Sequence, residues 1–159
     1  MATFRPAVSA HSNVPEAVIA QVVQTPDAPA VCAQSGFLTY RGMDQQANRL
    51  ARSLRVLGVG KDVPVGLCVP RSPQMVIGAL AIWKAGGAYV PLDPTNPPER
   101  LVSILEDAQA QAVLSTPSLA QKLSKARCPV VHAETPHVAG QSAAPLSLEV
   151  APADLAYVI

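Results

Sequence analysis

The side chains that could hold a metal ion are few. Cys128, His132 and His137 follow one another closely, but their spacing matches no zinc pattern and the sequence has no second pair of such residues. We therefore predict no metal site. Cys32 and Cys68 stand, like Cys128, among aliphatic neighbours, and we predict that all three are buried, reduced thiols of a cytoplasmic protein.

Three further side chains have types that could contact a ligand. Arg71-Ser72-Pro73 follows a predicted strand, at the edge where open α/β sheets bind ligands; we favour helix capping there. Lys84 ends a predicted helix, where the helix dipole favours a cation, and Trp83 is interpreted as core filling. The sequence has no glycine-rich phosphate loop, catalytic triad or carboxylate pair. We therefore predict no catalytic, cofactor-binding or metal-binding residue in it.

Composition excludes several classes of partner. The formal net charge is +1 and the basic residues never form a run of three, which gives no electrostatic reason to expect nucleic acid or an acidic membrane. No stretch reaches the roughly 18 apolar residues of a membrane span. Charged residues make up 14%, against about 25% in a typical globular protein. This fits either a piece of a larger body, with faces covered by neighbours, or a small alanine- and proline-rich domain.

The elements that would position these side chains begin after an N-terminal segment, residues 1–12, that we predict to be unstructured. Asn13 and Glu16 have capping-box spacing, and the apolar residues that follow to Val23 recur at helical intervals. Two short runs, Ala30–Ala33 and Phe37–Thr39, predict a hairpin. We treat residues 13–159 as one domain.

A long helix follows the hairpin. Thr39 can cap its first turn, and Gly58 stands where a left-handed residue would end it. Apolar residues between them recur at steps of three and four: Met43, Ala47, Leu50, Ala51, Leu54 and Leu57.

Strands then alternate with helices. The strands are predicted at Val63–Val69, Ala88–Leu92, Ala112–Leu114 and Val130–His132. The helices are predicted to start at Ser72-Pro73, at an Asn96 cap and at Thr116-Pro117, and the first to stop at Gly86-Gly87. The alternation predicts an α/β fold, a mainly parallel sheet with helices on both faces. Residues 133–152 indicate a surface connection. Leu155–Ile159 indicates a strand, and its abrupt end suggests truncation.

Three segments carry a resemblance to a known family. Leu38–Gly60 (LTYRGMDQQANRLARSLRVLGVG) resembles the Leu-Thr-Tyr-x-Glu-Leu opening motif of the adenylate-forming superfamily and its helix. Trp83–Leu101 (WKAGGAYVPLDPTNPPERL) is similar almost letter for letter to the Lys-Ala-Gly-Gly-Ala-Tyr-Val-Pro-Leu-Asp-Pro motif of nonribosomal peptide synthetase adenylation domains. Asp154–Ile159 (DLAYVI) resembles the strand before the family's phosphate-binding loop. Order and spacing agree from Asn13 onward.

The sequence departs from these motifs in two places. Gly42 stands where the family has the Glu of a capping box with Thr39, a loss of the order of 1 kcal/mol for the helix start. Trp83 stands where the family more usually has an aliphatic residue. Asp93 before Pro94 is expected to shape the turn that leaves the second motif.

The resemblance implies an incomplete first subdomain of the large N-terminal domain of an adenylate-forming enzyme. Such enzymes join a carboxylate to AMP with ATP and Mg²⁺, then pass the acyl group to a phosphopantetheine thiol. The implied partners are the remainder of the adenylation domain, carrier and condensation domains, and an amino acid. The family's phosphate loop and catalytic residues come later in its chains, so we expect this stretch alone to bind no cofactor and to be inactive.

Two other interpretations stay open. One is a fragment of an acyl-CoA or aryl-acid ligase of the same superfamily. The other is a non-catalytic remnant that acts as an interaction module. The sequence does not identify the amino acid, because the substrate pocket would lie outside it.

Overall fold

The computed structural model describes residues 13–33, 36–132, 136–147 and 150–159. The segment predicted to be unstructured, residues 1–12, lies outside the described residues. At the centre is a parallel sheet in the order β4-β3-β5-β6. Its strands are β3 (Pro64–Cys68), β4 (Ala88–Pro91), β5 (Ala112–Ser115) and β6 (Val130–His132). The predicted parallel sheet is therefore confirmed.

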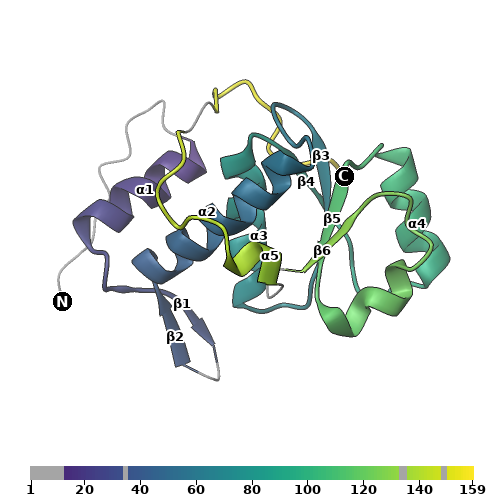
Figure 1. The fold of residues 1–159 in the computed structure, drawn as a ribbon, viewed down its shortest axis with the longest axis horizontal. Coiled ribbons are helices and arrows are strands. Elements are labelled where there is room, and N and C mark those ends of the chain that lie inside the picture. The colour runs from purple at the N-terminus through teal and green to yellow at the C-terminus, as the bar shows by residue number, and fades with distance from the viewer. Residues whose placement is uncertain (1–12, 34–35, 133–135, 148–149) are drawn as a thin grey trace.

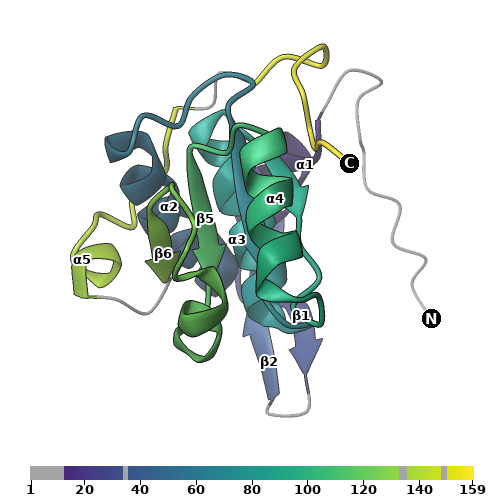
Figure 2. The ribbon, with the colours of Figure 1, turned by 90° about the vertical axis from the view of Figure 1, so that its right-hand side faces the viewer.

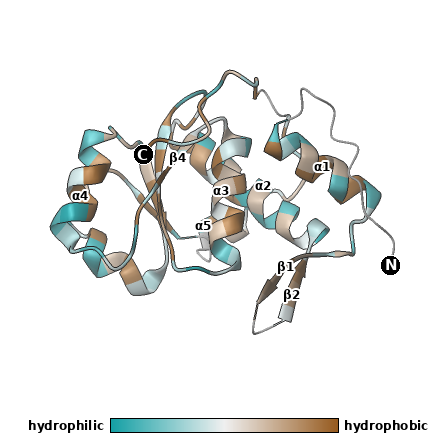
Figure 3. Cartoon of the chain, turned by 180° about the vertical axis from the view of Figure 1, so that it is seen from behind, coloured by the Kyte–Doolittle hydropathy of each residue, from teal (hydrophilic) through white to brown (hydrophobic). Residues whose placement is uncertain are grey.

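Helices cover both faces of this sheet, also as predicted (Figures 1 and 2). On one face α2 (Tyr40–Val56) and α3 (Pro73–Ala85) pack against β3 and β5. On the other face, α4 (Pro98–Asp107) and the 3₁₀ helix η1 (Pro117–Leu123) form a second, smaller core. Figure 3 shows both hydrophilic and hydrophobic residues along α1, α2 and α4, as expected of helices with one buried face.

Glycine at position 66 allows α4 to pack closely on β3. A Cβ atom on Gly66 would lie 2.5 Å from Leu105 Cδ2 and 2.9 Å from Val113 Cγ2. Both neighbours are buried core residues that cannot withdraw freely. The strand β3 therefore needs glycine at position 66, where the smaller core packs directly against its backbone.

The N-terminal elements lie outside the α2–α3 layer. They are α1 (Val14–Gln24) and an antiparallel hairpin of β1 (Pro29–Ala33) and β2 (Gly36–Thr39). Asn13 Oδ1 accepts the Glu16 N–H at 3.0 Å, and Thr39 Oγ1 accepts the Gly42 N–H at 3.1 Å. Both predicted caps are confirmed.

Helix ends confirm two further predictions and contradict one. Gly58 has φ 86° after α2, and Gly86 has φ 99° after α3, so both use the left-handed region that favours glycine. The predicted Asn96 cap is wrong. Pro97 is the N-cap of α4, without a side-chain hydrogen bond, and the helix begins at Pro98. Pro97 and Pro98 follow each other, and α4 begins at Pro98, one residue later than the expected start at Pro97.

The predicted connection 133–152 contains more structure than its composition indicated. A short helix, α5 (Pro136–Ala139), inserts Val138, which is 3% exposed, against the larger core. Beyond it, residues 142–147 lie along α2, where Arg52 donates to the Ser142 and Ala144 carbonyls at 3.0 and 2.8 Å. The correction has a physical cause, because the segment is held by side-chain donors that α2 supplies and local sequence pattern does not reveal them.

The last described residues lie beside β4. Tyr157 pairs with Tyr89 in a single parallel bridge, and Val158 donates its N–H to the Tyr89 carbonyl at 3.0 Å. The predicted strand at Leu155–Ile159 is thus extended and parallel to the sheet, but only one bridge forms. No helix in the described part of the chain is long and apolar enough to cross a membrane.

Candidate functional site

A groove of about 950 Å³ runs along α3, from the carboxyl ends of β3 and β4 to Trp83 in the last turn of the helix. Ligands of parallel α/β sheets bind at this carboxyl edge. The groove is mostly apolar at its base and polar at its rim. Its lining residues are Leu67, Val69, Pro70, Arg71, Met75, Val76, Ala79, Trp83, Tyr89, Pro91, Leu92, Asp93, Pro94 and Thr95.

The rim of the groove carries one ordered carboxylate. Asp93 Oδ1 accepts the Thr95 N–H at 2.9 Å and the Thr95 hydroxyl at 2.8 Å. The predicted Asp93 turn is confirmed. The backbone hydrogen bond from Thr95, followed by its hydroxyl and then Arg71 and Lys122, lowers the pKa of Asp93. Arg71 and Asp93 together give the rim mixed charge rather than the convergent donors that a phosphate needs.

Helix capping at Arg71-Ser72-Pro73 is corrected in part. Pro73 does occupy the first position of α3, as expected. Ser72, however, donates its hydroxyl to the Pro70 carbonyl at 3.1 Å and makes no side-chain cap bond. Arg71 is exposed and lines the groove. Its position at the end of β3 therefore fits the other interpretation of this segment, in which Arg71 faces a ligand, better than helix capping, which we favoured from the sequence.

Trp83 is not core filling, contrary to the prediction. Its side chain is only half-buried and lines the groove beside Tyr89, with ring centroids 5.7 Å apart. The indole Nε1 donates to the Ala156 carbonyl at 2.8 Å. The residues of α3 on the same side, Met75 and Val76, are exposed. The core instead receives the other side of α3, including Ile77 and Leu80.

Lys84 lies in the last turn of α3, as predicted, but it is buried rather than exposed. It is 1% exposed, and its Nζ donates to Asp44 Oδ1 at 2.6 Å and to Asn48 Oδ1 at 2.8 Å. Asn48 in turn donates to Asp44 Oδ2 at 2.9 Å and to the Ala143 carbonyl at 3.0 Å. This buried cluster joins α2, α3 and the following segment. Sequence reasoning missed it, although the spacing of Asp44 and Asn48 along the apolar side of α2 was a usable signal.

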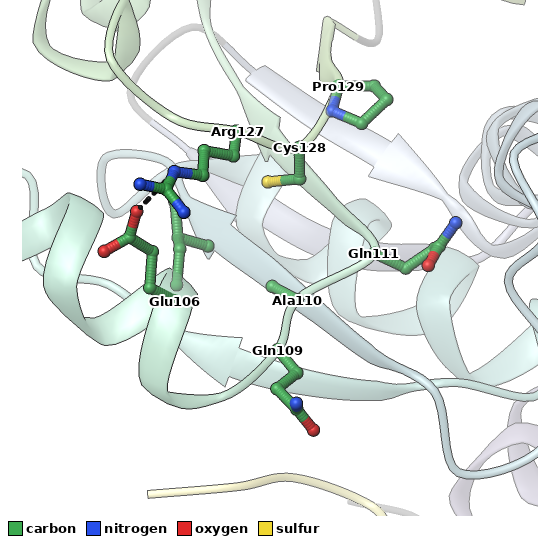
Figure 4. Close-up of a pocket in the computed structure, with 8 residues that line it drawn as sticks. Glu106, Gln109, Ala110, Gln111, Arg127, Cys128 and Pro129 are labelled. Atoms are coloured by element: carbon green, nitrogen blue, oxygen red, sulfur yellow. Dashed lines mark ion pairs between the residues drawn. The ribbon is translucent and has the colours of Figure 1, made fainter.

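A second hollow, of about 490 Å³, lies at the opposite, amino-terminal edge of β5 and β6 (Figure 4). Arg127 pairs there with Glu106 at 3.1 Å, but both side chains are largely exposed and such pairs contribute little. Burial raises the pKa of the neighbouring Cys128 thiol, which disfavours the reactive thiolate. This hollow has neither the location nor the chemistry expected of an active site.

The cysteines and histidines form no assembled centre in the part of the chain that the structure describes. No group of three His, Cys, Asp or Glu side chains lies close enough to hold a metal ion there. Cys68 is buried, as predicted, but Cys128 is only half-buried and Cys32 is exposed on the hairpin, which corrects the prediction for these two residues. All three are free thiols.

The residues present do not fit ATP or Mg²⁺. The described ranges offer no cluster of metal ligands, and the sequence has no glycine-rich loop that could surround phosphates. The groove offers one arginine and one ordered carboxylate, which follow the carboxyl ends of the neighbouring strands β3 and β4. We therefore assign no nucleotide or metal contact to the residues that the structure describes.

Comparison with known proteins identifies the family. The model of the AMP-binding enzyme family matches residues 18–159, and the chain belongs to this family. One protein of the linear gramicidin synthase of Brevibacillus parabrevis is 42% identical over 146 residues, which cover 92% of this chain and 2% of that protein. Tyrocidine synthase 3 of the same organism is 48% identical over 144 residues, 87% of this chain and 2% of the synthase. The chain thus spans a few percent of these relatives.

Solved structures agree with the family. A nonribosomal peptide synthetase, FmoA3, bound to α-methyl-L-serine-AMP has a TM-score of 0.88 and 35% identity, over 94% of this chain and 17% of that one. The N-terminal subdomain of Klebsiella oxytoca NpsA has a TM-score of 0.71 over 84% of this chain and 34% of its own; at 23% identity it supports the fold alone.

Proposed function

We propose that this chain is the first part of an amino-acid adenylation domain of a peptide synthetase. The observation that carries the proposal is the likeness, over 94% of the chain, to FmoA3 with an aminoacyl adenylate bound. The whole domain would join an amino acid to AMP with ATP and Mg²⁺. It would then load the aminoacyl group onto the phosphopantetheine thiol of a carrier domain, beside a condensation domain in the same synthetase.

Within that domain, this stretch would act as scaffold. We propose that none of its residues is catalytic, cofactor-binding or metal-binding, in line with the mixed-charge rim of the groove. Its contribution would be a rigid parallel sheet, two cores and the carboxyl edge beside Asp93. The chemistry would come from residues that follow in the longer protein.

The alternatives are less well supported. A fragment of an acyl-CoA or aryl-acid ligase would share the fold, but the gramicidin and tyrocidine relatives are peptide synthases. A non-catalytic interaction module would explain the exposed apolar groove without any reaction. We also propose a cytoplasmic location, which is consistent with three free cysteines.

The test uses the longest natural protein that carries this chain, called the parent protein below. It should catalyse amino-acid-dependent exchange of labelled pyrophosphate into ATP for at least one amino acid among the proteinogenic set and common variants. Fatty acids and aryl acids serve as matched substrates for the ligase alternative. Exchange with those acids and not with amino acids would reassign the chain, and no exchange with any acid would favour the interaction module.

A further inference from the structure

Residues 154–158 contact three separate elements: the strand β4, the helix α3 and the loop before β3. Their backbone joins the outer edge of β4, where Tyr89 donates its N–H to the Ala156 carbonyl at 3.2 Å and accepts from Val158 at 3.0 Å. Two backbone bonds and one bridge are a weak attachment for an edge segment. Side chains from α3 and from the loop before β3 supply the rest.

The first side chain is Trp83. Its indole N–H reaches the Ala156 carbonyl at 2.8 Å, so that one carbonyl accepts from both Trp83 and Tyr89. The rings of Trp83, Tyr89 and Tyr157 form a continuous row with centroid distances of 5.7 and 5.8 Å. The hydrogen bond to the Ala156 carbonyl and the packing of the Tyr157 ring therefore favour the same register of this segment against β4.

The second side chain is Asp62, in the loop between α2 and β3. Its Oδ1 accepts the Leu155 N–H at 2.7 Å. Asp62 has φ 59°, a left-handed conformation that costs energy for most residues and that Asp and Asn tolerate best. Its neighbour Lys61 pairs with Asp154 at 2.7 Å, and Asp154 accepts the Ala151 N–H at 2.8 Å. The loop thus binds the segment at Leu155, one residue before Ala156, which Trp83 binds.

We propose that Trp83 and Asp62 are positioning residues that set the register of residues 154–158 against β4. A slip of one residue would turn every side chain of the segment to the opposite face. In the observed register, parallel continuation from the Tyr89–Tyr157 bridge brings Ile159 level with Pro91, the last residue of β4. Whatever follows Ile159 in a longer chain then leaves at the carboxyl edge, next to the groove, where parallel sheets bind ligands.

Only the expected effect on ATP binding rests on the proposed function. If the residues that follow contact ATP, their placement depends on the register that Trp83 and Asp62 set. An altered register should then weaken ATP binding while leaving the amino-acid site unaffected. The register itself can be measured without any activity.

The structural arm of the test measures hydrogen exchange in the parent protein. Trp83→Phe keeps a ring and removes the donor, and Trp83→Leu removes both. We expect faster exchange, by about two- to tenfold for Trp83→Phe and more for Trp83→Leu, in the peptide spanning residues 150–159. The peptide of α2 should be unchanged. Phe37→Leu, which removes an exposed aromatic ring on the distant hairpin, is the matched control and should alter neither peptide.

The same arm tests Asp62 with two variants that both tolerate its backbone conformation. Asp62→Asn keeps an oxygen acceptor for the Leu155 N–H, and Asp62→Gly removes it. Asp62→Gly should accelerate exchange of residues 150–159, and Asp62→Asn should behave like the wild type. Equal behaviour of Asn and Gly, or acceleration spread over the whole domain, would overturn the proposal and leave only a general stability effect.

The kinetic arm follows pyrophosphate exchange. Trp83→Phe and Asp62→Gly should raise the KM for ATP by about two- to tenfold, with the KM for the amino acid unchanged. Equal losses for both substrates would contradict a positioning role. If the wild-type parent shows no exchange at all, the proposed function fails, whereas the hydrogen-exchange arm still decides whether Trp83 and Asp62 set the register.

Discussion

The ammonium nitrogen of Lys84 on α3 lies 2.6 Å from a carboxylate oxygen of Asp44 on α2, and the lysine side chain is 1% exposed. Asn48 completes the cluster and extends it to the Ala143 carbonyl. The two helices that cover one face of the sheet are therefore joined by charge as well as by apolar packing. A buried pair of this kind is costly to break, because the partner left behind keeps its charge without water.

Replacing Lys84 should test how strongly the protein depends on this pair. Lys84→Met should lower the free energy of unfolding by about 3–5 kcal/mol, because Asp44 would be buried without its cation. Chemical denaturation of the parent protein measures the change. Lys125→Met, at an exposed lysine, is the control and should stay within about 0.5 kcal/mol. The double variant with Asp44→Leu should recover at least half of the loss, and a single-variant loss below about 1 kcal/mol would contradict the assignment.

Completing the capping box should stabilise α2. Gly42→Glu allows the new side chain to reach back to the Thr39 N–H, and it should be more stable than Gly42→Ala by about 0.5–1.5 kcal/mol. A Cβ atom added at Gly42 would lie 3.1 Å from Leu38 Cδ1 and 3.2 Å from Thr39 Oγ1. The alanine variant is the right reference because both variants introduce this close contact, and only glutamate adds the capping side chain. Thermal unfolding compares them. Equal melting temperatures would mean that no reciprocal bond forms.

Acid should loosen the last described segment. The hydrogen bond from Lys61, followed by that from the Ala151 N–H, lowers the pKa of Asp154. Its stabilising contribution is therefore complete above the ordinary Asp pKa of about 3.9 and is lost as the pH falls through the lowered value. Asp154 also raises the pKa of Lys61, so the same pair is lost in strong alkali as the pH rises through that raised value.

The measurement is the stability difference between the wild type and Asp154→Asn at several pH values. It should be constant from about pH 7 to 5 and shrink towards zero below about pH 4. Asp93→Asn changes a carboxylate whose pKa is also lowered, but in the Thr95 turn. That control should leave acid-induced loosening of residues 150–159 in place. A pH-independent difference for Asp154→Asn would contradict the ion pair.

Residues 1–159 produced alone should not exchange pyrophosphate with any amino acid. Charge that builds on phosphates needs oriented donors and a metal site, and the described residues provide no cluster of metal ligands. Supplying the remaining part of the parent domain as a second polypeptide should restore exchange. Activity of the 159 residues above a heat-killed control would overturn the scaffold role.

Sequence patterns within one helical turn predicted the helix caps and ends, but the sequence did not predict contacts between residues far apart along the chain. The caps at Asn13 and Thr39 and the helix end at Gly86 depend on residues within one turn, so spacing alone revealed them. Lys84 meets Asp44 across 40 residues, and Trp83 meets Ala156 across 73. Each looked like an ordinary helix residue because its partner lies on another element. The groove was likewise invisible, since which face of an apolar helix is buried depends on what packs against it.

The contact between Trp83 and Ala156 has a consequence during synthesis on the ribosome. The carbonyl that Trp83 and Tyr89 share is made 73 residues after Trp83 itself. At translation rates of about 5–20 residues per second, the outer edge of β4, counted from Tyr89 to Ala156, waits roughly 3 to 13 seconds for its neighbour. An unpaired strand edge is a template for pairing with other chains. The outer edge of β4 is therefore open to pairing with other nascent chains until residues 154–158 arrive.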